Sequence, residues 1–267
     1  MEKITGSKLK KIEKLKKFLR KFPGVVVAFS GGVDSTFLLK IAVDILKDNV
    51  IAVTATSPLY PETELRLAKR IAKRLNVKHI VIRSSELENK YFKSNTVNRC
   101  FYCKLELFKN LKKIAQRNGF IVIEASNYSD LSDFRPGLMA AMKLGIKSPL
   151  IAAKITKDEI RFFAKMLKLP NWDKPSMACL ASRIPYGVEI NKKILRRIER
   201  AEGFLKRLEF SQFRVRDHFP IARIEILQNE FTRMIKNRMR IIKFFKKIGY
   251  SYITFDLEGY RIGSMNI

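Results

Sequence analysis

Short runs of apolar and β-branched residues alternate with amphipathic segments along the first half of the 267-residue chain. Apolar runs of this kind are typical of parallel strands that are buried on both faces. Strands that alternate with helices predict βαβ units, so the fold class that we expect is α/β with a doubly wound parallel sheet. The predicted strands are 25–30, 50–54, 79–83 and 120–125, and the predicted helices are 7–21, 35–46, 62–75 and 103–117.

The pattern changes in the last third of the chain. Thr156 and Glu159 have the spacing of a capping box, which predicts a helix that ends near residue 169. Three prolines between 170 and 185 then indicate an irregular stretch. We predict an α/β domain at 1–175, a linker at about 170–186, and a small α+β domain at 186–267. The elements predicted for this second domain are helices 192–208 and 230–248 and strands 213–216, 222–227 and 252–257.

The formal charge of +29 suggests nucleic acid as a partner, since clustered cations release counterions from a phosphate backbone. The basic residues are, however, spread over several segments at helical spacing, as on ordinary solvated helix faces. Charge alone does not decide between RNA binding and a lysine-rich proteome.

The sequence shows no pattern of a signal peptide and no apolar run near the roughly 20 residues that cross a bilayer. We therefore expect a soluble, cytoplasmic protein without a membrane partner. Three cysteines in a reducing compartment are more often buried, reactive or metal-bound than disulfide-bonded.

The segment from Ser30 to Ser35 reads S-G-G-V-D-S and joins a predicted strand to a predicted helix. Gly31 and Gly32 allow backbone N–H groups to face an anion, and the helix N-terminus adds a positive dipole. The segment resembles the PP-loop of ATP pyrophosphatases, which cleave ATP between the α and β phosphates. The resemblance implies ATP and Mg²⁺ as cofactors, with Asp34 near the metal. We expect the adenosine near Thr54 to Ser57, after the second strand.

Cys100 and Cys103 form a C-x-x-C pair, and Cys179 is the remaining cysteine. Three thiolates could hold three irons of a 4Fe-4S cluster and leave the fourth iron open. The alternatives are a zinc site completed by His79 or His218, or cysteines without a role.

Polar residues follow the fourth predicted strand, among them Asn127, Asp130, Asp133 and Arg135. Ligands of doubly wound sheets bind at the carboxyl ends of the strands, so these residues are candidates for nucleotide or substrate contacts. Asx turns and local ion pairs would explain each of them equally well.

Several longer phrases, which span nearly the whole chain, are together similar to the LarE family of ATP-dependent sulfur insertases. They are D-F-R-P-G at 133–137, L-P-N-W-D-K-P at 169–175, A-C-L-A-S-R-I-P-Y-G at 178–187, A-R-I-E at 222–225 and E-G-Y-R-I-G-S-M-N at 258–266. The resemblance implies that two carboxylates of a pyridinium mononucleotide become thiocarboxylates during synthesis of the nickel-pincer nucleotide cofactor. The chain departs from the family at Glu124-Ala-Ser-Asn127, where many members have a glycine after an aspartate.

The resemblance also assigns roles to single residues. Cys179 matches the cysteine that gives up its sulfur in single-cysteine members. Cys100 and Cys103 match the branch in which a 4Fe-4S cluster carries the sulfur, which requires a sulfide source. Arg214 and Arg216 match a pair associated with the substrate phosphate. Two guanidinium groups side by side suit a phosphate, because each can donate two parallel hydrogen bonds to its oxygens. Asp133, Arg135, Arg183 and Glu202 are further candidates for the substrate site.

The resulting hypothesis is an AMP- and pyrophosphate-forming sulfur transferase that acts on a pyridinium-3,5-biscarboxylic acid mononucleotide. We also expect a homo-oligomer, as in other family members. Two alternatives stay open: a tRNA thiolase of the PP-loop superfamily, and a zinc-stabilised nucleotide-binding module without catalysis.

Overall fold

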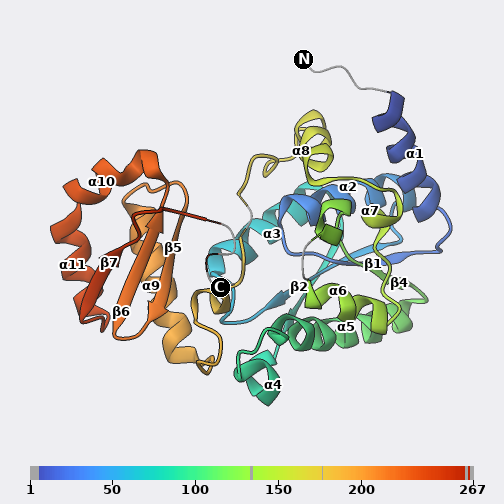
Figure 1. Cartoon of the computed structure of the whole chain (residues 1–267). Coiled ribbons are helices and arrows are strands. Elements are labelled where there is room, and N and C mark those ends of the chain that lie inside the picture. The colour runs from blue at the N-terminus through green and yellow to red at the C-terminus, as the bar shows by residue number, and fades with distance from the viewer. Residues whose placement is uncertain (1–5, 133–134, 176, 262–263, 265–267) are drawn as a thin grey trace. The chain divides into compact units, whose positions relative to one another are not determined.

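The computed structural model describes residues 6–132, 135–175, 177–261 and 264. The chain forms two compact units (Figure 1). The first unit comprises Met1–Ser57, Glu62–Asn89 and Asn98–Met177, and the second comprises Pro58–Pro61, Lys90–Val97 and Ala178–Ile267. The sequence did not indicate that two short segments of the N-terminal half join the second unit. The predicted domain limits therefore stay a prediction.

A four-stranded parallel sheet forms the centre of the first unit, with the strand order β3-β2-β1-β4. The strands are β1 (Val25–Ala28), β2 (Val50–Thr56), β3 (Lys78–Arg83) and β4 (Ile121–Ile123). Successive side chains of a strand point to opposite faces. In β1, Val25 and Val27 therefore enter one apolar cluster and Val26 enters another. Both faces of the sheet are thus buried, which explains the continuous apolar run.

Helices cover both faces of this sheet (Figure 1). The first cluster contains residues of α1 (Gly6–Leu19), α2 (Val33–Leu46), α3 (Glu62–Arg74) and α8 (Lys157–Met166). The second cluster contains residues of α5 (Arg99–Asn118) and α6 (Pro136–Lys143). The predicted α/β fold class is confirmed.

The second unit contains a small sheet with the order β5-β6-β7. Strands β5 (Phe213–His218) and β6 (Ile221–Ile226) are antiparallel, and β7 (Tyr252–Phe255) runs parallel to β6. The apolar cluster of this unit joins α9 (Lys192–Arg207) and α11 (Arg238–Lys247) to the sheet, and the rings of Phe204 and Phe244 stack at 4.2 Å. One face of the sheet is therefore apolar, and polar residues gather on the other.

Two predicted helices differ from the structure. The helix predicted at 230–248 is divided at Asn237 into α10 (Phe231–Lys236) and α11. The side-chain amide of Asn237 donates to the carbonyl of Arg233, and such local bonds compete with a continuous helix. The helix predicted from Cys103 begins at Arg99, so that it includes Cys100.

The sequence pattern did not predict the shorter helices. These are α4 (Lys90–Lys93), α6, α7 (Pro149–Ala152) and the 3-10 turns η1 (Glu86–Glu88), η2 (Tyr128–Ser132), η3 (Leu180–Arg183) and η4 (Gln228–Glu230). Among the described residues, no helix combines the length and the apolar composition that crossing a bilayer requires.

Candidate active site

The predicted phosphate loop lies at the carboxyl end of β1 and leads directly into α2. Gly31 has a φ of +73°, and a Cβ there would lie 3.1 Å from the Cβ of Ala68 on α3. Only glycine fits both the backbone conformation and this close approach. The N-cap Gly32 offers no side-chain cap, so the first N–H groups of α2 have no partner within the helix. The loop therefore suits a bound phosphate.

Ser30 and Ser35 hold this loop together. Their hydroxyl oxygens lie 3.1 Å apart, and the Ser35 hydroxyl donates to the carbonyl of Gly32 at 3.1 Å. The N–H of Gly32 in turn donates to the Ser30 hydroxyl oxygen at 3.3 Å. The serine side chains shape the loop before any ligand arrives.

Asp34, in the first turn of α2, forms an ion pair with Lys157, the first residue of α8. The ammonium of Lys157 lies 2.6 and 2.7 Å from the two carboxylate oxygens. Burial raises the pKa of Asp34 above its ordinary value, although the positive charge of Lys157 opposes this effect. Lys157 had no predicted role, and the signal that could have marked it is its position directly after the capping residue Thr156.

Asn171, which was also not predicted as a site residue, holds the phosphate loop through two hydrogen bonds. Its amide nitrogen donates to the carbonyl of Gly31 at 2.9 Å and to the hydroxyl of Thr36 at 3.0 Å. Asn171 is 2% exposed, and its own side-chain oxygen is buried without a partner among the described residues. No periodicity marks this residue, because it lies in an irregular segment.

Thr54 is buried and anchors the strand that precedes the loop. Its hydroxyl donates to the carbonyl of Phe29 at 2.7 Å and lies 2.8 Å from Nε2 of His79. Because the hydroxyl proton goes to Phe29, the geometry assigns the Nε2 proton to His79. Burial and the charge of Lys69 lower the pKa of His79, which favours this neutral ring. Ser57, the other predicted adenosine contact, is half-buried directly after β2.

The polar segment after β4 is held by its own hydrogen bonds. The backbone N–H of Asn127 donates to Asp130 at 3.0 Å, and the side-chain oxygen of Asn127 accepts from the N–H of Ser129. Arg135 forms an ion pair with Asp130 at 2.9 Å. Asp130 and Arg135 are close enough to affect the pKa of Asp34. This segment therefore borders the phosphate loop, while the candidate Asp133 lies outside the described residues.

Glu124 carries the departure from the family pattern. Its carboxylate accepts hydrogen bonds from the N–H and hydroxyl of Ser126 and from the hydroxyl of Ser148. These hydrogen bonds hold the backbone after β4 in one conformation, although the glycine of the family pattern is missing here.

Cys100 and Cys103 lie near the N-terminus of α5, in the first unit. Residues three apart share one face of a helix. The helix dipole favours a thiolate at this end. Cys100 is exposed and Cys103 half-buried, and neither is part of a disulfide.

Cys179 is half-buried, is not part of a disulfide either, and belongs to the second unit, where it occupies the N-cap position of η3 without a side-chain cap hydrogen bond. Neither unit alone therefore holds all three cysteines. Within the described parts of the chain, no group of three or more His, Cys, Asp or Glu side chains is arranged to hold a metal ion.

Arg183 fixes the backbone that carries Cys179. Its guanidinium is 1% exposed and donates to the carbonyls of Ala178 and Cys179 at 2.7 and 3.0 Å. It also pairs with both carboxylate oxygens of Glu202 at 2.9 and 3.0 Å. Glu202 further accepts from the N–H of Val215 at 3.1 Å. In this structure Arg183 and Glu202 are thus scaffold residues of the Cys179 segment.

Arg214 and Arg216 lie on the polar face of β5. Arg216 pairs with both oxygens of the fully buried Glu225, at 2.9 and 2.7 Å. Arg214 lies with its guanidinium 5.1 Å from the ring of Tyr260. Burial, followed by the charge of Arg183, lowers the pKa of Arg214. The gathered positive charge around Arg214 is suited to an anion.

Comparisons with known proteins find relatives that match most of this chain. A family model described as NAD synthase matches residues 9–132. An uncharacterized protein of Synechocystis sp. is 39% identical over 96% of this chain and 97% of its own length. An uncharacterized protein of Methanocaldococcus jannaschii is 33% identical over 95% of this chain and 98% of its own.

The pyridinium-3,5-bisthiocarboxylic acid mononucleotide synthase of Lactiplantibacillus plantarum is 36% identical over 93% of this chain and 91% of its own length. The match includes both units and is too extensive to reflect the phosphate loop alone. The chain belongs to the family of this synthase, the LarE family of PP-loop proteins.

Proposed function

We propose that the protein is an ATP-dependent sulfur transferase that converts carboxylates of pyridinium-3,5-biscarboxylic acid mononucleotide into thiocarboxylates, for synthesis of the nickel-pincer nucleotide cofactor. The observation that carries this proposal is an open phosphate loop, with Asp34 at its helix, in a chain 36% identical to the Lactiplantibacillus plantarum synthase.

The first step is the activation of a carboxylate. The pyrophosphate part of ATP binds to the N–H groups of the Ser30–Ser35 loop, and Asp34 holds Mg²⁺ together with the phosphates. A carboxylate oxygen of the substrate attacks the α-phosphorus, and the bond from this phosphorus to pyrophosphate breaks. The loop stabilises the leaving pyrophosphate. The products are an acyl-adenylate and pyrophosphate.

The second step replaces oxygen by sulfur. A sulfide nucleophile attacks the acyl carbon, the bond between this carbon and the AMP oxygen breaks, and the sulfide proton is released to water. AMP leaves and a thiocarboxylate remains, with no net oxidation or reduction. For repeated turnover, this sulfide must come from a source outside the polypeptide chain.

We propose that Arg214 and Arg216 bind the substrate phosphate. The support is the burial of Arg214 and, after it, the positive charge of Arg183, which both lower the pKa of Arg214 and favour a neutralising anion. Arg183 and Glu202 act on this site through the scaffold that they form. Asp133 and Arg135 remain candidates for substrate contacts, and Thr54, Ser57 and Asn127 for nucleotide contacts.

The three cysteines have the donor chemistry of an iron–sulfur site, because thiolates are the usual ligands of iron in such clusters. We propose that Cys100, Cys103 and Cys179 hold a 4Fe-4S cluster. When bound, this group supplies the sulfide. Protein purified without oxygen should contain about four irons and four sulfides per chain, and both should be lost in Cys100→Ala and Cys179→Ala. Zinc without iron would reject the cluster. If the protein contained no zinc and no iron, Cys179 would remain as a single-use sulfur donor.

The ATP step is tested by pyrophosphate release in the presence and absence of the pyridinium substrate. Substrate-dependent release is expected from the wild type and from a control, Ser211→Ala, at an exposed serine of the second unit. Ser35→Ala and Asp34→Ala should lower this release by at least about tenfold, since each removes a group that shapes the loop or holds Mg²⁺. Unchanged release in both variants would reject the proposed ATP site. Light scattering tests the expected homo-oligomer.

A further inference from the structure

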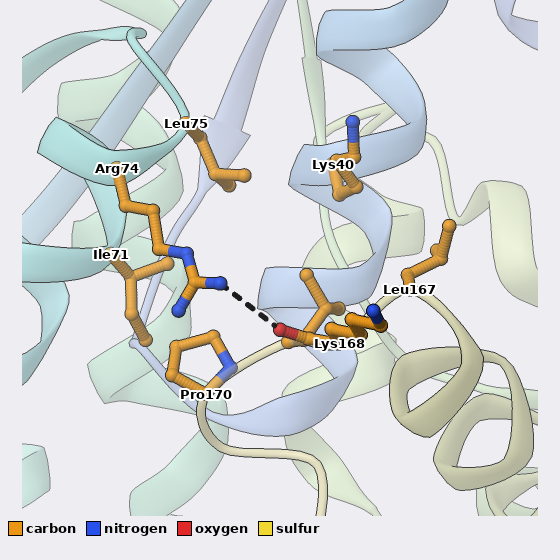
Figure 2. Close-up of a pocket in the computed structure, with 8 residues that line it drawn as sticks. Lys40, Ile71, Arg74, Leu75, Leu167, Lys168 and Pro170 are labelled. Carbon is orange, nitrogen blue, oxygen red and sulfur yellow. Dashed lines mark hydrogen bonds between the residues drawn. The ribbon is translucent and has the colours of Figure 1, made fainter.

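A hollow of about 210 Å³ lies between α2, α3 and the segment that follows α8, outside the phosphate loop (Figure 2). Ile71, Leu75 and Leu169 form an apolar part of its wall, while Lys40, Arg74 and Lys168 contribute cationic groups. All of these residues belong to the first unit. The volume is below the roughly 300–1,000 Å³ of pockets for drug-sized ligands, so it suits a ligand with a single small ring or a short chain.

The charges around this hollow favour an anion. Lys40 forms an ion pair with Asp44 at 2.6 Å, which neutralises one of the three cations. Arg74 donates through one nitrogen to the carbonyl of Lys168, at a long 3.4 Å (Figure 2). A guanidinium has five N–H donors, so this single bond leaves Arg74 able to bind a carboxylate or phosphate. Lys168, which is exposed, also lines the hollow and brings a third positively charged side chain to it.

The same elements continue directly to the phosphate loop. Lys168 and Leu169 precede Asn171, whose amide holds the carbonyl of Gly31. On α3, Ala68 lies against Gly31 one turn before Ile71. A ligand that fixes the segment 167–170 against α2 and α3 would therefore also fix Asn171 beneath the loop.

We propose that this hollow is a second binding site, for a small organic anion with an apolar body and a carboxylate or phosphate head. Binding there strengthens the binding of ATP, because both ligands favour the same position of Asn171. The effect is reciprocal, since each ligand must change the affinity of the other by the same factor. The proposal that an anion binds here depends only on the hollow, whereas the proposed coupling to ATP rests on the proposed function.

Benzoate is a suitable probe, and benzamide is its neutral analogue of nearly equal shape. Titrations of the full chain, labelled at the isoleucine and leucine methyl groups, locate binding through the signals of Ile71, Leu75, Leu167 and Leu169. We expect saturable shifts of these signals with benzoate and at least about fivefold weaker binding of benzamide, as for a lost charge-assisted hydrogen bond.

Lys168→Asn tests the cationic part. Lys168 has a φ of 52°, which asparagine tolerates, so the change removes the charge and keeps the backbone. Lys154→Asn is the control, because Lys154 also has a positive φ, of 57°, is exposed and does not line the hollow. Benzoate should bind about threefold or more weakly to Lys168→Asn and unchanged to Lys154→Asn.

The link to ATP is measured with the analogue α,β-methylene-ATP and Mg²⁺. We expect each ligand to tighten the other about fivefold in the wild type, and Asn171→Ala to abolish this effect while benzoate still binds. Equal binding of benzoate and benzamide, or no shifts at these methyl groups, would overturn the site even if ATP binds normally. Absence of ATP binding with normal benzoate shifts would instead count against the proposed function, and independent binding of the two ligands would overturn the link.

Discussion

Lys157 donates to both carboxylate oxygens of Asp34, at 2.6 and 2.7 Å, beside the phosphate loop. The two residues lie on the first turns of different helices, α8 and α2, so the ion pair joins these helices at the loop. If Asp34 binds Mg²⁺ as proposed, the ammonium of Lys157 would lie beside the loop and be available to the phosphates of ATP. Lys157 would then have a partner both with and without ATP.

Lys157→Met should weaken ATP binding and lower pyrophosphate release, each by about tenfold, because it removes one charge-assisted contact with phosphate. Calorimetric titration with α,β-methylene-ATP and a pyrophosphate assay measure the two effects. Lys113→Met, at an exposed position of α5, is the control. If both variants bind and turn over ATP equally, Lys157 serves only its ion pair with Asp34 and makes no contact with ATP.

Asn171→Ala should lower the free energy of unfolding by about 1–3 kcal/mol, because Gly31 and Thr36 lose a buried donor. Thr36→Val removes only one of these bonds and should cost less. Denaturant titration compares the two variants with the wild type. An equal or larger loss in Thr36→Val would show that the bond to Gly31 contributes nothing.

The stability of the wild type should depend on His79 below neutral pH. Because the folded pKa of His79 is lowered below 6.5, the unfolded chain binds the proton more readily. The contribution of the neutral ring is complete above pH 6.5 and is lost as the pH falls toward the lowered value. His79→Gln keeps an N–H donor but does not titrate. The difference in melting temperature between wild type and His79→Gln should therefore shift against the wild type on acidification, and a difference that is constant with pH contradicts the assignment.

The pair of Arg183 and Glu202 should matter to Cys179 without contacting its thiol. Arg183→Met leaves a buried carboxylate without its partner and should destabilise the second unit by about 3–5 kcal/mol. It also removes the donors that hold the carbonyls of Ala178 and Cys179. Combining Arg183→Met with Glu202→Leu should restore part of the stability, because no buried charge remains, but not the backbone of Cys179.

Alkylation of the Cys179 thiol measures this local effect. We expect faster reaction in Arg183→Met and also in the double variant, compared with wild type. A rate that returns to the wild-type value in the double variant would mean that the lost stability, and not the lost carbonyl contacts, exposes the thiol.

The sequence predicted the central sheet because its strands are buried on both faces, as the division of Val25, Val26 and Val27 between two clusters shows. It predicted the phosphate loop because two glycines directly precede the start of a helix there. The ion pair of Asp34 with Lys157 and the contact of Asn171 with Gly31 join residues more than 100 positions apart, and local patterns carry no signal for such pairs. The side-chain amide of Asn237 likewise divides a helix that continuous periodicity predicted.

Substrate labelled with ¹⁸O in its carboxylates tests the proposed reaction most directly. If the carboxylate attacks the α-phosphorus of ATP and sulfur then displaces AMP, each AMP must carry one labelled oxygen from the substrate, and each thiocarboxylate must have lost one. Mass spectrometry of AMP and product after a single turnover measures both. Unlabelled AMP, or label in inorganic phosphate with ADP as the nucleotide product, would contradict adenylation of the carboxylate.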